Sequence, residues 1–100
     1  MKCKTAALAA ALVAFPAWGA EIASPAMLGD TCAGCHGTDG VSPGPIPGIR
    51  GFPKDYLVTT MKAFRDGKRP ATIMDRIAKG YTDEEIEAMA EYFSGEPGRY

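Results

Sequence analysis

The stretch that decides the fold is Cys32-Ala33-Gly34-Cys35-His36, which sets two thiols and an imidazole within five residues. The C-x-x-C-H spacing is typical of covalent attachment of c-type haem. In that chemistry each thiol adds to a vinyl group of the porphyrin to form a thioether, and the next histidine offers a ring nitrogen to the iron. The motif therefore predicts one haem c, attached through Cys32 and Cys35, with His36 as an axial ligand.

Two other uses of a C-x-x-C pair have to be weighed. A thioredoxin-like dithiol lies near a βαβ pattern, and no such pattern is visible here. A structural zinc site needs four nitrogen or sulfur ligands, whereas beyond residue 20 the sequence offers only Cys32, Cys35 and His36. Haem attachment is therefore the favoured interpretation.

The first residues read as an export signal. Residues 1–20 hold two lysines near the start, then an apolar run, then proline and small residues. This pattern predicts a cleaved signal peptide, with the cut after Gly19 or Ala20. The apolar run is shorter than the ~20 residues that span a bilayer. We therefore expect a periplasmic protein without a membrane anchor, in which Cys3 is removed.

The remaining segment, residues 21–100, is predicted to be one all-α domain. Its prolines and glycines concentrate between Gly37 and Pro53, and no alternation of apolar and polar residues argues for strands. A chain of this length is near the lower limit for an independent core, so the haem is expected to supply much of it.

Three helices are expected around the motif. Ser24-Pro25 is typical of a helix start, and a short helix should run from there into Cys32. A second helix should follow Pro53 and end before Gly67, with a core stripe formed by Leu57, Met61 and Phe64.

The last helix should begin at Thr82, whose spacing to Glu85 fits a capping box. We expect it to cross the first helix, with Phe93 or Tyr92 near Leu28. Its apolar face consists of Ile86, Met89, Ala90 and Phe93.

The segment from Gly37 to Gly51 is expected to form a loop over one side of the haem. Within it, Gly44-Pro45 is a candidate to offer a backbone carbonyl to the second ring nitrogen of His36, or Pro45 simply forms a turn. Two interpretations of Arg50 also stay open: it pairs with a haem propionate, or it is solvated.

The sixth ligand of the iron is predicted to be Met74. It lies in an apolar stretch soon after Pro70, and its separation from His36 lets the chain cross to the opposite face of the porphyrin. His/Met ligation raises the reduction potential into the electron-transfer range. Met61 and Met89 are the alternatives, but both belong to helical stripes that are more typical of packing.

This order of elements resembles the class I c-type cytochromes over essentially all of residues 21–100. The resemblance implies three to four short helices around one haem, with His36 and Met74 as axial ligands. More narrowly, the motif, the segment from Thr72 to Tyr81 and that from Glu87 to Phe93 are similar to the cytochrome subunits of flavocytochrome c sulfide dehydrogenases. Because no second C-x-x-C-H follows, we expect a mono-haem version.

The narrower resemblance implies a partner flavoprotein, which carries FAD, oxidises sulfide and passes electrons singly to this haem. The chain itself would then be a non-catalytic electron-transfer subunit, with a downstream acceptor such as a soluble cytochrome and no nucleic-acid partner. Residues 50–79 hold eight basic and three acidic residues. The surface around Met74 is thus either a docking face, to which charge attraction guides a partner protein, or a solvated surface of mixed charge.

Two other functions share the same motif. A freely diffusing mono-haem carrier would differ only in its surface. A haem sensor would need a weak or absent sixth ligand.

Overall fold

The computed structural model describes residues 10–11 and 22–95. The predicted signal peptide and Cys3 lie outside the described residues, apart from positions 10 and 11, so export remains a prediction. Within the described part, no helix has the length and apolar character needed to cross a membrane.

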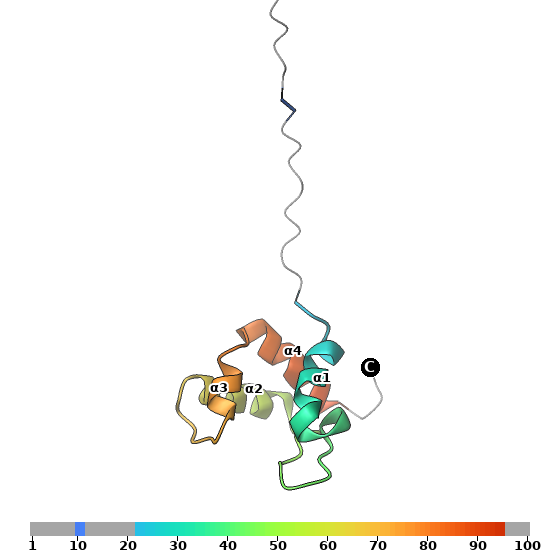
Figure 1. The fold of residues 1–100 in the computed structure, drawn as a ribbon, viewed down its shortest axis with the longest axis vertical. Coiled ribbons are helices and arrows are strands. Elements are labelled where there is room, and N and C mark those ends of the chain that lie inside the picture. The colour runs from blue at the N-terminus through green and yellow to red at the C-terminus, as the bar shows by residue number, and fades with distance from the viewer. Residues whose placement is uncertain (1–9, 12–21, 96–100) are drawn as a thin grey trace, which may run out of the picture.

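Four α-helices and one 3₁₀ turn form the described domain (Figure 1). Residues 22–95 contain no strand, which confirms the all-α prediction. Both α1 and α2 pack on α4, and α3 packs on α2. The elements are α1 (Pro25–His36), η1 (Thr38–Gly40), α2 (Lys54–Arg65), α3 (Met74–Ala78) and α4 (Asp83–Ser94).

Helix α1 begins as predicted but ends later. The Ser24 hydroxyl accepts a hydrogen bond from the backbone N–H of Met27 at 3.3 Å, and Pro25 occupies the first turn. The helix continues past Cys32 to His36. Because residues three and four apart share a helix face, this extension holds Cys32, Cys35 and His36 together on one rigid element.

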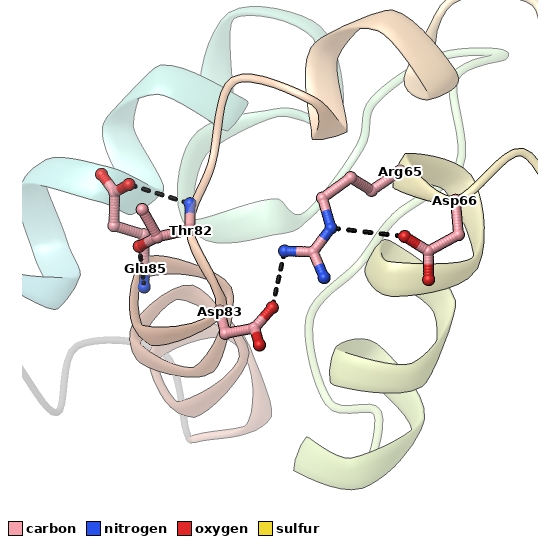
Figure 2. A network of polar contacts seen from close by, with 5 residues as sticks. All are labelled: Arg65, Asp66, Thr82, Asp83 and Glu85. Atoms are coloured by element: carbon pink, nitrogen blue, oxygen red, sulfur yellow. Dashed lines mark hydrogen bonds and ion pairs between the residues drawn. The ribbon is translucent and has the colours of Figure 1, made fainter.

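Helix α4 carries the predicted capping box (Figure 2). The Thr82 hydroxyl accepts from the Glu85 N–H at 3.2 Å, and the Glu85 carboxylate accepts from the Thr82 N–H at 3.0 Å. The predicted apolar face is confirmed, since all four of its residues are buried. Beside the box, Arg65 of α2 pairs with Asp83 at 2.6 Å and joins the two helices.

The crossing of α1 and α4 differs in detail from the prediction. Leu28 packs with Ile86 and Met89, and not in the cluster that contains Tyr92 and Phe93. Tyr92 instead lies against Gly29, where an added Cβ would come within 2.5 Å of the tyrosine ring. The crossing point is therefore set by the lack of a side chain at Gly29, which lets a flat ring approach the helix backbone closely.

Candidate cofactor site

A hollow opens between α1, the 37–51 loop, α2, α3 and α4. It consists of two adjoining cavities of about 210 and about 450 Å³, the larger within the ~300–1,000 Å³ typical of cofactor sites. Most of the lining is apolar, with a few polar groups. Eight residues line both cavities: Cys32, His36, Pro47, Phe64, Arg69, Met74, Ile77 and Tyr81.

The two cysteines of the motif both face this hollow, and they are not joined by a disulfide. Cys35 is exposed, whereas the half-buried Cys32 thiol lies 3.9 Å from the Met89 sulfur. Burial raises the pKa of the Cys32 thiol, and a hydrogen bond with Thr31 partly opposes that rise. At neutral pH this thiol is therefore held as the neutral S–H on an apolar wall.

The imidazole of His36 is oriented by the loop. Its Nδ1 lies 2.6 Å from the backbone carbonyl oxygen of Pro47. A carbonyl oxygen only accepts, so Nδ1 carries the proton and donates, which leaves Nε2 as the ring nitrogen with a free lone pair. This is the second-sphere contact that fixes the orientation of a ligating histidine.

One of the two interpretations of the sequence placed this carbonyl at Gly44-Pro45, whereas the structure has the carbonyl of Pro47 in contact with the ring of His36. Pro45 lines the larger cavity, but the loop brings Pro47, two residues further on, over the ring of His36. Every residue of the loop carries a carbonyl, so the sequence had no signal to select one. The choice depends on how the loop is pinned at its far end.

Arg50 fixes the far end of the 37–51 loop through hydrogen bonds. This differs from both interpretations of the sequence, in which Arg50 either pairs with a haem propionate or is solvated. Its Nε donates to the Asp39 carbonyl at 2.5 Å, and one terminal nitrogen donates to the carbonyls of Tyr92 and, at 3.1 Å, of Gly95. The guanidinium also lies 4.6 Å from the centre of the Tyr92 ring. The last carbonyls of a helix lack partners within it, so Arg50 joins the loop to the end of α4.

Arg50 lines neither cavity, so the interpretation that pairs it with a haem propionate is not supported. The network continues through Tyr92, whose hydroxyl donates to the Asp39 carboxylate at 2.8 Å. That bond is the main cause of the raised pKa of Tyr92.

Met74 is the first residue of α3 and lies on another side of the hollow. Like His36 it lines both cavities, whereas Met61 and Met89 line only the smaller one, and Met89 is buried in the core. Helix α3 is five residues long and has no side-chain cap. The arrangement suits Met74 better than the other two methionines as a ligand reaching into the hollow.

Two features of the site escaped sequence reasoning. The hydroxyls of Thr31 and Tyr81 lie 2.9 Å apart and connect α1 to the end of the Met74 segment. Arg69 lines both cavities, although in the sequence it was only one of several basic residues. Neither position carries a local signal, because each depends on contacts between separate elements.

The donor set fits haem c. Two thiols and an imidazole project from one helix, a methionine faces the same apolar hollow, and His36 has an orienting carbonyl. In the described part of the chain, no three His, Cys, Asp or Glu side chains converge as a metal-binding group.

Comparison with known proteins agrees with this chemistry. Residues 20–95 match the Cytochrome c family. The chain is 52% identical over 67 residues to the cytochrome subunit of sulfide dehydrogenase of Chlorobaculum tepidum, an alignment that covers 67% of this chain and 61% of that protein.

Two further relatives are aligned over more of their own length. Cytochrome c-554(548) of Halomonas halodenitrificans is 43% identical over 70 residues, covering 66% of this chain and 84% of the relative. Cytochrome c-553 of Nitratidesulfovibrio vulgaris is 36% identical over 89 residues, covering 84% and 87%. The chain therefore belongs to the cytochrome c family, as a class I c-type cytochrome with one covalently bound haem c.

Proposed function

We propose that Cys32 and Cys35 form the thioethers to the haem, and that His36 and Met74 are the axial ligands of its iron. The support is geometric. All four side chains line one hollow, and they come from two elements separated by the whole of α2. The 3.9 Å approach of Cys32 to Met89 places one thiol against the core, while Cys35 is exposed.

When bound, the haem iron gains and loses one electron. The chain contributes position and environment. Through its Nδ1–H bond to Pro47, His36 is held in one tautomer and one orientation, which also increases its basicity as a ligand. The apolar lining from α2 and α3 excludes water and keeps the local dielectric low, and a thioether ligand at Met74 favours the reduced iron.

We infer further that this cytochrome is the periplasmic electron-transfer subunit of a flavocytochrome c sulfide dehydrogenase. In this role it accepts electrons singly from an FAD-containing subunit that oxidises sulfide, and passes them to an acceptor such as a soluble cytochrome. The observation that carries this proposal is the 52% identity to the Chlorobaculum tepidum subunit. The chain would catalyse no bond-making step itself.

Purification from the native source tests this role. The expected result is co-elution with a larger FAD-containing polypeptide, and reduction of the haem when sulfide is added to the complex. The isolated cytochrome, as a control, should not be reduced by sulfide at a comparable rate. A native protein that elutes as a monomer and stays oxidised when mixed with sulfide and its cell extract would contradict the proposal.

The second candidate is a freely diffusing mono-haem electron carrier. It is favoured by the matches to cytochrome c-554(548) and cytochrome c-553, whose own lengths are largely covered. Gel filtration of a native extract separates the two: a carrier elutes at the size of a single small domain, and a subunit elutes with its flavoprotein.

A further inference from the structure

The hollow contains a single permanent charge among the described residues that line it, and that charge belongs to Arg69. Arg69 belongs to the segment that joins α2 to α3. Figure 1 shows this segment on the side of the domain away from α1. Its guanidinium lies 5.2 Å from the centre of the Phe64 ring. This contact holds a charged group at a cavity whose lining is mostly apolar.

No carboxylate neutralises this guanidinium in the described part of the chain. The ion pairs found there are both formed by Arg65, with Asp66 and Asp83. The polar neighbour of Arg69 is instead Tyr56, which also lines the smaller cavity. A hydrogen bond with Arg69, and then the charge of Arg69, lower the pKa of the Tyr56 hydroxyl.

The ligand chemistry follows from the porphyrin. Its two propionates project from the edge opposite the vinyl groups, and the vinyl edge is the one that Cys32 and Cys35 fix to α1. The carboxylates are then expected at the side of the hollow away from α1, where the segment carrying Arg69 lies. A planar guanidinium is the side chain best suited to bind a carboxylate with two parallel hydrogen bonds.

We propose that Arg69 and Tyr56 form the carboxylate-binding site of the haem pocket, with the guanidinium and the phenol hydroxyl both donating to a haem propionate. The sequence suggested propionate binding as one possible role of Arg50, but in the structure Arg50 is hydrogen-bonded to the carbonyls of Asp39 and Gly95. Arg69 takes that role instead. The inference rests on the haem and is independent of any partner flavoprotein.

The expected consequence is a reduction potential that changes little with pH. A neighbouring cation holds a carboxylate in its ionised form, so the propionate keeps the same charge through the neutral range. Without Arg69 its pKa rises, and its protonation then couples to the charge of the iron. Four other titratable groups line the hollow: Cys32, Cys35 and His36, assigned to the haem, and Tyr81, hydrogen-bonded to Thr31.

The test compares Arg69→Gln with Lys68→Gln in the haem-loaded protein alone. Both substitutions remove one positive charge from adjacent exposed positions, but Lys68 lines neither cavity. Midpoint potentials are measured by spectroelectrochemistry from about pH 5 to about pH 8, the range in which a propionate with a raised pKa titrates. Arg69→Gln should introduce a pH-dependent slope, whereas the wild type and Lys68→Gln should give parallel, nearly flat curves.

Two further variants make the test specific. Arg69→Lys keeps the charge and should restore most of the flat profile, and Tyr56→Phe should produce a smaller slope than Arg69→Gln. Infrared redox difference spectra should show the carboxylate band of the propionate shifted in Arg69→Gln and, by less, in Tyr56→Phe, but unchanged in Lys68→Gln. If Arg69→Gln and Lys68→Gln give the same curves and the same infrared bands, Arg69 does not bind the propionate.

Discussion

The side of the haem pocket that carries His36 (the His36 wall) and the side that carries Met74 (the Met74 wall) are stabilised by different contacts. On the His36 side, a 12-residue helix capped by Ser24 leads into a loop whose end is bonded through Arg50 to α4. On the Met74 side, α3 has only five residues and no side-chain cap. Ile73 and Ile77, which flank Met74 on this wall, are 57% and 38% exposed.

This difference has a functional meaning. The ring of His36 is fixed by a hydrogen bond to the backbone of the loop, whereas Met74 lies on a short element held mainly by packing on α2. Short elements with few buried contacts are the ones that open first. We expect Met74 to be the weaker and more easily displaced of the two axial ligands.

The largest effect is expected from Met74→Ala. Loss of the thioether should leave the iron five-coordinate or water-bound, so that carbon monoxide binding to the reduced protein changes from undetectable to stoichiometric, and the reduction potential falls. Met61→Leu and Met89→Leu are the matched controls and should leave the ligand spectrum unchanged. An unaltered spectrum in Met74→Ala would refute the assignment, and carbon monoxide binding by the wild type would favour a sensor.

Arg50→Ala should cause the next largest change, on the His36 side. It removes a charged donor from the carbonyls of Asp39, Tyr92 and Gly95, which costs about 2 to 3 kcal/mol of unfolding free energy. Chemical denaturation of the haem-loaded protein measures it. Because Arg50 lines neither cavity, the pH profile of the reduction potential should stay as in the wild type. A new slope would instead place Arg50 at a propionate.

Gly29→Ala tests how tightly α1 and α4 cross. The new methyl group would meet the Tyr92 ring at 2.5 Å, and that ring is held by Asp39 and by the Arg50 guanidinium. Overpacking of this kind costs about 1 to 3 kcal/mol.

Gly34→Ala is the control for Gly29→Ala, since an added Cβ there meets nothing within 4 Å. It should stabilise the helix by up to about 1 kcal/mol, because alanine is the better helix former. Equal thermal midpoints for the two variants would show that Tyr92 can move aside, and that the crossing is looser than the contacts indicate.

Tyr81→Phe is expected to weaken the Met74 wall by about 1 kcal/mol, the usual net value of one hydrogen bond. The lost bond is the 2.9 Å contact with Thr31. The readout is the temperature or pH at which the absorption band of methionine ligation disappears, which should fall. Thr31→Val should give a similar shift, and the double variant should show no further loss from this bond. Fully additive effects would argue against the link.

Asp83→Asn should have the smallest effect. The guanidinium of Arg65 lowers the pKa of Asp83, so the pair stabilises the fold above the unfolded-state pKa, and the contribution is lost as the pH falls through the folded-state pKa. Asp83 is exposed and Arg65 is partly exposed, so salt screens the pair. Thermal midpoints should therefore differ slightly at neutral pH and converge in acid or in high salt. Glu84→Gln, in the same turn of α4, controls for the helix dipole.

The sequence by itself determined the local elements and the chemistry of attachment. Ser24-Pro25 and the Thr82–Glu85 box define where two helices begin, because each supplies its own hydrogen bonds to the first turn. The C-x-x-C-H motif indicated haem because its spacing is local. Met74 was selected by its distance along the chain from His36, and the structure brings it to the same hollow.

Only the tertiary structure decided which distant groups meet. Pro47 rather than Pro45 orients His36, and Arg50 binds the end of α4, because the loop is fixed by carbonyls 42 and 45 residues further along the chain. Arg69 lies at the cavity because α2 and α3 pack together there. The sequence does not show which group a backbone carbonyl or an arginine will bind, because the packing of the helices decides which groups come within hydrogen-bond distance.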